Sequence, residues 1–181
     1  MRAALLAIVI VAMGAGVADA RQGVGTPAPT GDLAGGYSFL REMPKGGASR
    51  DYKQGWFVTG AHRILWDRLW AVGEIDSHRR QNIVGEQARL TAYLGGVRVP
   101  LVGIWRVRVF GQVLAGVERF SEPGLAQSAF AFQPGAAVDV RVIDRLGVRV
   151  QADYRGVTQD DITYREMRVA AGAVVWLRDH R

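Results

Sequence analysis

Cysteine is absent from this chain of 181 residues, and lysine is almost absent. Without cysteine, the chain has neither a disulfide framework nor a lipid-anchored N-terminal cysteine. Long hydrophobic runs are also missing, because the one apolar run, residues 3–17, falls short of the roughly 20 residues that a transmembrane helix needs. If the mature protein lies in a membrane, it must therefore cross that membrane with strands.

The N-terminus has the composition of an export signal. A positive start, Met1-Arg2, precedes the apolar run, and the small-residue site Ala18-Asp19-Ala20 follows it. This order predicts a secretory signal peptide over residues 1–20, cut after Ala20. The alternative is a hydrophobic helix that the mature protein retains. Residues 21–31 are rich in Gly, Pro and Thr, which predicts a flexible leader.

The formal net charge is +6, and it stays +6 after removal of residues 1–20, which carry one charge of each sign. Basic proteins often bind nucleic acid or acidic membrane surfaces. Here the arginines are spread along the chain and do not form a basic tail. For an exported protein, this distribution argues against a nucleic-acid partner.

Residues 146–155 show the clearest alternation of side chains. One face carries Leu146, Val148, Val150, Ala152 and Tyr154, and the other carries Gly147, Arg149, Gln151, Asp153 and Arg155. Strand side chains alternate between two faces, so this stretch predicts a strand with one apolar and one charged surface. A soluble β-sandwich can show the same pattern with its apolar face inward, so the direction of that face decides the functional reading.

Eight strand-like segments follow the leader. They span residues 32–42, 53–63, 69–77, 88–99, 104–119, 129–141, 146–156 and 164–178. Short connections alternate with longer polar connections, which are residues 43–52, 78–87, 121–128 and 157–163. In an up-and-down arrangement, this alternation places the short turns and both termini at one end, as in outer-membrane barrels. The sequence therefore predicts an all-β, eight-stranded antiparallel up-and-down transmembrane β-barrel over residues 32–178, with residues 179–181 as a C-terminal tail.

Most segments support this arrangement in detail, and two need comment. The apolar faces of the clearer segments run over about 10 residues, the length of a tilted spanning strand. Residues 88–99 carry apolar residues in both phases, which leaves their facing open. Pro134 cannot donate a ladder hydrogen bond and predicts a bulge or local break. Trp and Tyr residues near strand ends favour an aromatic girdle at the membrane interfaces.

Four stretches resemble small outer-membrane β-barrel domains of the OmpA/OmpX-like type. They are Gly35–Leu40, Ala71–Asp76, Leu94–Arg98 and Arg145–Tyr154. The resemblance spans about residues 32–178 and implies a barrel in the outer membrane of a Gram-negative-type bacterium. It also implies outer-membrane lipid and the barrel insertion machinery as partners. Because the family has no shared catalytic motif, the resemblance implies a fold and no activity.

With the apolar faces outward, the charged side chains of the strands are expected in the lumen. Six of each sign are placed there: Glu74, Asp76, Glu118, Asp139, Asp153 and Glu166 with Arg106, Arg108, Arg141, Arg149, Arg155 and Arg168. An eight-stranded barrel has an interior barely wide enough for its own side chains, and unpaired charges there would be costly. The sequence therefore predicts a paired ion network that plugs the lumen, in preference to a conducting pore.

Catalytic, metal and cofactor sites are not indicated. The histidines His62, His78 and His180 are assigned to a strand end, a loop and the tail, and Ser77 is expected beside His78 in a solvated loop. We therefore expect a non-enzymatic protein with a structural or surface-interaction role, whose long loops contact an extracellular partner. Two alternatives remain open: a soluble periplasmic lipocalin-like barrel that binds an apolar ligand, and a lipid-modifying barrel enzyme.

Overall fold

A computed structural model describes residues 29–44, 48–65, 68–81, 87–159 and 162–178. The predicted signal peptide, most of the leader and the C-terminal tail lie outside these residues. The described residues include no helix long and apolar enough to cross a membrane. Their regular structure consists of strands.

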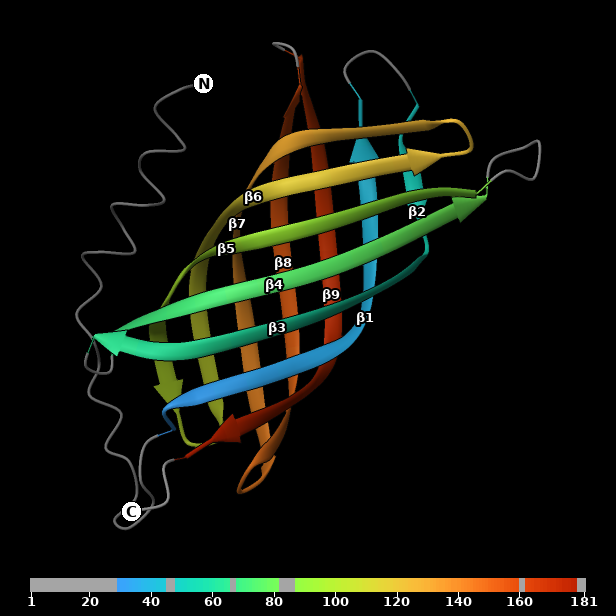
Figure 1. Cartoon of the computed structure of the whole chain (residues 1–181). Coiled ribbons are helices and arrows are strands. Elements are labelled where there is room, and N and C mark those ends of the chain that lie inside the picture. Colours follow the sequence, from blue (N-terminus) through green and yellow to red (C-terminus); the bar gives the residue numbers. More distant parts are fainter. Residues whose placement is uncertain (1–28, 45–47, 66–67, 82–86, 160–161, 179–181) are drawn as a thin grey trace.

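The strands form one closed antiparallel sheet (Figure 1). In chain order they are β1 (Gly31–Met43), β2 (Arg50–Tyr52), β3 (Gln54–Leu65), β4 (Leu69–Gln81), β5 (Gln87–Ile104), β6 (Val107–Glu122), β7 (Leu125–Ile143), β8 (Leu146–Gln159) and β9 (Ile162–Leu177). Both β2 and β3 pair with β1, one after the other along its length, so together they occupy one of the eight strand positions of the barrel. Pairing of β1 with β9 closes the sheet. The predicted eight-stranded barrel is confirmed.

The β1–β9 seam depends on two glycines that face each other across it. Gly36 pairs with Gly172, and both residues lie on the inward phase of their strands. A Cβ atom at Gly36 would lie 2.3 Å from the Ala171 carbonyl oxygen, and one at Gly172 would lie 2.2 Å from that of Gly35. These distances exclude any side chain, so the glycines allow the close approach that bends the wall at the seam.

The strands run further than predicted at the end opposite the termini. β6 and β7 pair up to Glu122 and Leu125, and Pro123-Gly124 joins them. Gly124 has a φ of 80°, and Pro followed by a Gly with positive φ is typical of a type II turn. β8 and β9 likewise pair up to residues 159 and 162.

The prediction of long loops is therefore wrong for two of the four, residues 121–128 and 157–163. Most of these residues extend the strands of the β6–β7 and β8–β9 hairpins. The physical reason is that these hairpin ends project beyond the apolar wall. Where neither face of a strand meets lipid, the sequence no longer alternates between polar and apolar residues. The strand then leaves no periodic signal.

The apolar strand faces point outward. Val148 and Val150 are 46% and 48% exposed, whereas Arg149 and Gln151 are fully buried. On β5, whose facing the sequence left open, Tyr93 points outward, and Leu94 and Arg98 point inward. The alternation of residues 146–155 thus describes a barrel with an apolar outside and a polar inside.

Pro134 interrupts one ladder without shifting it. Pro134 pairs with Val113 of β6. On the other side of β7, Gln133 and Pro134 have no partner in β8. The pairs before and after the gap, Phe132 with Gly156 and Gly135 with Asp153, keep the same register. The predicted local break is confirmed, and it arises because proline lacks the N–H that β8 would accept.

An apolar belt surrounds the barrel. Each strand position contributes large exposed side chains, among them Leu33, Val58, Ile75, Tyr93, Val113, Phe132, Val150 and Val169. A contiguous apolar surface of this extent is unusual for a soluble monomer and typical of a wall that faces lipid. Tyr37 and Trp56 point outward as a girdle requires, but Trp70 and Trp176 point into the lumen.

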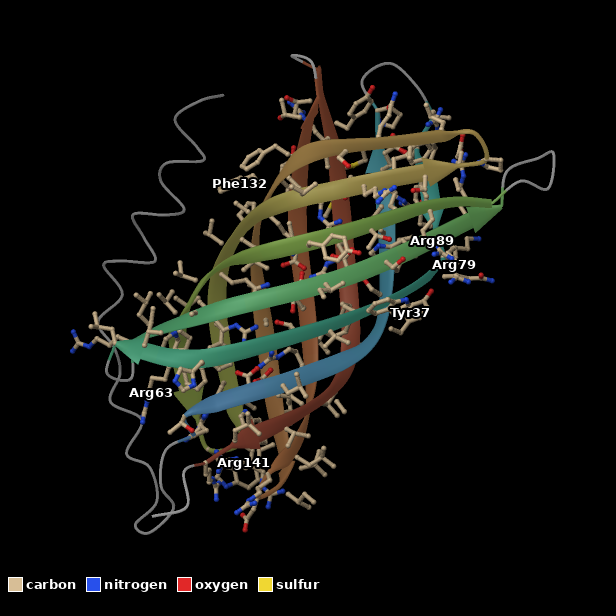
Figure 2. The ribbon with its side chains drawn as sticks, in the orientation of Figure 1. Tyr37, Arg63, Arg79, Arg89, Phe132 and Arg141 are labelled. Atoms are coloured by element: carbon tan, nitrogen blue, oxygen red, sulfur yellow. The ribbon has the colours of Figure 1, made fainter. Side chains whose placement is uncertain are left out.

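The belt ends in a ring of exposed arginines on the side away from the termini. This arginine rim consists of Arg41, Arg79, Arg89, Arg119 and Arg165. Figure 2 shows Arg79 and Arg89 near the ends of β4 and β5, far from Arg63 and Arg141 at the opposite end. The rim therefore separates the apolar wall from the projecting hairpins.

Candidate functional site in the barrel lumen

Arg149 organises the part of the lumen nearest the termini. Its guanidinium donates two hydrogen bonds to Asp139 on β7, each 2.7 Å long. A third hydrogen bond reaches Asp32 on β1 at 2.9 Å, and Asp32 also accepts from Arg98 at 3.1 Å. All four side chains are buried. Charged pairs with this forked geometry are among the stronger hydrogen bonds in proteins.

Arg168 occupies the middle of the lumen. It donates to Glu74 at 2.7 Å and to Asp153 at 2.6 Å. Its other terminal nitrogen lies 3.4 Å from Asp76. One buried cation thus contacts three buried carboxylates from β4 and β8. Each carboxylate would be costly to bury without this partner.

Three buried glutamines connect the charged groups. An amide has both a donor and an acceptor, so it can join a cation to a carboxylate. Gln112 accepts from Arg98 and donates to Asp153, both at 3.2 Å. Gln133 accepts from Arg155 at 2.7 Å and donates to Glu74 at 2.8 Å, while Gln151 donates to Glu74 at 2.9 Å. The network is therefore continuous along the lumen.

Arg155 holds the end of the network away from the termini. Its guanidinium donates to Asp76 and, at 2.8 Å, to Glu118, and it lies 3.8 Å from Glu166. Beyond this level lies an apolar cluster, which we call the cap. The cap consists of Leu40, Tyr52, Leu90 and the partly buried Phe120.

His78 lies inside the barrel, so its assignment to a solvated loop is wrong. Because β4 continues to Gln81, residue 78 falls on the inward phase and its side chain is fully buried. Its Nε2 atom lies 2.9 Å from Ser38 Oγ, and its Nδ1 atom lies 3.2 Å from Asp76 Oδ1. A Cβ atom at Gly55 would lie 2.3 Å from the imidazole, so the ring packs directly on backbone.

Ser38, His78 and Asp76 have the order of a hydrolase relay, but their surroundings differ from those of an active site. All three side chains are fully buried beneath the apolar cap. The Nδ1 atom of His78 has no hydrogen bond of acceptable geometry. Ser77, the other serine considered from the sequence, points away from the lumen and lies 3.1 Å from Thr91. The arrangement therefore presents no nucleophile to a substrate.

The structure brings together nine of the twelve lumen residues named from the sequence. They are Glu74, Asp76, Glu118, Asp139, Asp153, Glu166, Arg149, Arg155 and Arg168, all buried. The other three are placed differently. Arg106 lies exposed in the β5–β6 turn with its guanidinium 4.9 Å from the centre of the Trp105 ring, and Arg108 and Arg141 are only partly buried.

These three placements have two physical causes. Arg106 precedes β6, so the strand alternation does not extend to it. Arg108 and Arg141 lie at the mouth near the termini, where Arg141 stacks 5.3 Å from the centre of the Trp176 ring. Five residues absent from the sequence-based set complete the network: Asp32, Arg98, Gln112, Gln133 and Gln151. Arg98 was missed because the facing of β5 was open.

Metal binding finds no support in the lumen. Within the described ranges, no group of three or more His, Cys, Asp or Glu side chains could hold a metal ion. The carboxylates that are close together each face an arginine. What the arrangement can do chemically is fill the lumen with mutually neutralising groups.

Tyr52 gives the outer end of the barrel a pH-dependent contact. It lies beyond the belt, next to Asp51, which pairs with Arg41 of the rim at 2.7 Å. Burial, followed by the charge of Glu42, raises the pKa of Tyr52 to about 12. Because an unfolded tyrosine ionises near pH 10, Tyr52 stabilises the fold fully below that pH and loses this contribution as the pH rises towards 12.

Ultraviolet absorbance of tyrosinate tests this expectation. The difference between wild type and Tyr52→Phe should titrate close to pH 12, and the protein should unfold more readily above pH 10 than the variant does. A difference that titrates near pH 10, together with the other tyrosines, would contradict burial of Tyr52 within the cap.

Comparison with known proteins places the fold. No protein-family model and no curated protein sequence matches this chain. Among solved structures, Neisserial surface protein A matches with a TM-score of 0.69 and 11% identity, over 84% of this chain and 100% of that chain. Ail, the attachment invasion locus protein of Yersinia pestis, matches with a TM-score of 0.52 and 16% identity, over 82% and 99%.

The N-terminal β-barrel domain of OprF from Pseudomonas aeruginosa is similar as well. Its TM-score is 0.50 at 10% identity, over 82% of this chain and 99% of that domain. At identities this low, the likeness concerns the fold alone. That fold is the small eight-stranded barrel of outer-membrane proteins.

Proposed function

We propose that this protein is an outer-membrane barrel with a closed lumen, which acts through its outer surface as a structural or surface-interaction component of a Gram-negative-type envelope. The observation that carries the proposal is the lumen network. Arg98 and Arg149 are buried near the termini, Arg168 in the middle and Arg155 at the far end, and each contacts at least one carboxylate. The apolar belt supports placement in a membrane, and the fold of the neighbours supports the outer membrane.

A plug follows from the way the network spans the barrel. Its pairs join opposite walls, as between Asp76 on β4 and Arg155 on β8. Buried apolar residues, among them Phe57, Leu114 and Val174, fill the space beside the pairs. Opening a water-filled path would require several buried charges to separate together. The free-energy cost of such a step is high.

The other two candidate functions receive less support. A lipocalin-like barrel would place the apolar faces inside, whereas Val148 and Val150 point outward. A lipid-modifying enzyme needs a reactive group that reaches the membrane or water, whereas Ser38 and His78 are fully buried. The partners we propose are outer-membrane lipid, the barrel insertion machinery and an extracellular partner that contacts the projecting hairpins.

Conductance across planar lipid bilayers tests the closed lumen. The purified protein is expected to give no stepwise current above the bare membrane, with a porin of known conductance as the positive control. The variant Gln133→Ala removes one neutral link between Arg155 and Glu74 and leaves the charged pairs in place. Stable channels in the wild type, altered in amplitude by Gln133→Ala, would show an open lumen and refute the plug.

Membrane placement is checked on the same preparations. A folded barrel should migrate differently on SDS gels before and after boiling, and the protein should fractionate with the outer membrane. Recovery as a soluble periplasmic protein would contradict the placement. A protein that inserts but conducts would contradict only the plug.

A further inference from the structure

The outer wall has a depression over β3, β4 and β5, in the middle of the apolar belt. It is widely open, has a volume of about 500 Å³ and is lined on the outside by Val58, Gly60, Gly73, Ile75 and Tyr93. This volume falls within the range of small-molecule sites, roughly 300–1,000 Å³. The depression faces outward, so in a membrane it opens towards lipid.

Three glycines in one row produce the depression. Gly60 pairs with Gly73, and Gly73 pairs with Gly95 on the next strand. A Cβ atom added at Gly73 would meet nothing within 4 Å. The missing side chains are therefore not required by close backbone packing, unlike those of the β1–β9 seam. The row leaves open space on the wall.

Two arginines of the rim lie along the same strands above the depression. Arg79 and Arg89 pair directly across β4 and β5, and Figure 2 shows them close together at the strand ends. Arg119 follows on β6, opposite Thr91. Like charges directly opposite on neighbouring strands destabilise a sheet.

These arginines have no anion within the described part of the chain. No ion pair of Arg79, Arg89 or Arg119 is found there, whereas Arg41 of the same rim pairs with Asp51 at 2.7 Å. The cluster therefore presents positive charge at the edge of an apolar surface. A phosphate group is a ligand that two neighbouring guanidinium groups bind well.

The spacing between the arginines and the depression matches the dimensions of a lipid leaflet. Six residues separate Gly73 from Arg79, which is about 20 Å along a strand. With a strand tilt of about 40°, this corresponds to roughly 15 Å along the membrane normal. Half of the hydrocarbon core is also about 15 Å thick. A lipid whose head group lies at the arginines would thus place its chain end at the depression.

We propose that this face docks one anionic phosphorylated membrane lipid. Arg79 and Arg89 bind the phosphate, with Arg119 beside them. Thr91 lies partly exposed on the outward phase just below, beside the buried Ser77, at the level of the polar linkage of the lipid. An acyl chain follows Ile75 and Tyr93 into the depression over the glycine row. The proposal rests on placement in the membrane and does not depend on a closed lumen.

Native mass spectrometry of the detergent-solubilised protein tests this docking face. Phosphatidylglycerol and phosphatidylcholine with identical chains compete for the protein. We expect the wild type to retain phosphatidylglycerol about 30-fold more than phosphatidylcholine, because Arg79 and Arg89 each attract anionic lipid by roughly 1 kcal/mol and about 1.4 kcal/mol corresponds to a factor of ten. The double variant Arg79→Gln/Arg89→Gln should lose this preference.

Two control variants separate a site from a diffuse charge effect. Arg165→Gln removes an outward arginine of the same rim on β9 and should keep the preference. Gly73→Val fills the depression, for which there is space, and should lower retention of both lipids. Ala173→Val places the same valine side chain elsewhere on the belt and should change neither. Heat-modifiable migration on SDS gels checks that each variant is folded.

Several outcomes would overturn the proposal. Equal loss of preference in Arg165→Gln and in the double variant would indicate a nonspecific rim. Unchanged retention in Gly73→Val would remove the depression from the site. A third outcome concerns sucrose octasulfate, a soluble polyanion. If it binds the wild type but not the double variant, and the wild type shows no lipid preference, the arginines would be assigned to a soluble ligand. Failure of the wild type to insert would instead contradict the proposed function.

Discussion

Replacing Arg168 with alanine is expected to lower the free energy of unfolding by about 3–5 kcal/mol. The side chain is buried between Glu74 and Asp153 and approaches Asp76. Its removal leaves three carboxylates close together in a space with little water, and no other described cation can contact all of them from its position. Denaturant unfolding of the protein inserted in phospholipid vesicles, followed by tryptophan fluorescence, measures the loss.

Two further variants give this measurement its controls. Arg168→Lys keeps the charge but not the planar fork, so it should fall between wild type and alanine. Arg119→Ala removes an exposed arginine and should change stability by less than about 0.5 kcal/mol. Equal effects of Arg168→Ala and Arg119→Ala would mean that the lumen network contributes little to the fold.

Replacing Val150 with arginine is expected to cost about 2–4 kcal/mol, the range for an arginine that faces lipid near the bilayer midplane. Val150 is outward and 48% exposed in the middle of the β8 belt. Thr158 is outward on the same strand but lies near the arginine rim, and Thr158→Arg should cost about 0–1 kcal/mol. The same vesicle unfolding assay compares both variants.

The difference in unfolding free energy between Val150→Arg and Thr158→Arg distinguishes a lipid-facing wall from a water-facing one. In water, both substitutions would place an arginine on an exposed strand surface and would change stability by about 0.5 kcal/mol or less. Small and equal effects would therefore show that the apolar faces meet water. A large effect confined to Val150→Arg would show that the middle of the belt meets hydrocarbon.

The fold could be predicted from the sequence because its clearest strands alternate strictly. Over residues 146–155, every apolar residue faces outward and every charged residue faces inward. The facing of β5 could not be predicted because the lumen also holds apolar clusters. Leu90 and Leu94 face inward while Tyr93 and Val97 face outward, so polarity does not distinguish the two faces. Arg98 was missed for this reason.

The pairing within the lumen lies beyond local sequence patterns. Asp76 meets Arg155, and Glu74 meets Arg168, across the closed barrel. Strand phase predicts that such residues face inward, but only the tilt and stagger of the closed sheet decide which ones share a level. The position of His78 depended in the same way on how far β4 continues, because one more inward step moves the ring from a loop into the interior.

The β1–β9 seam has a consequence for biogenesis. The first strand, β1, pairs with the last, β9. An incomplete chain therefore has two unpaired strand edges until residues 162–177 are present. Unpaired backbone groups at such edges are not tolerated in hydrocarbon, and the missing strand would also withdraw Arg168 from its carboxylates. A chain truncated before β9 is therefore not expected to form a smaller closed barrel. Closure of the barrel therefore has to wait for the C-terminal strand, which pairs with both β8 and β1.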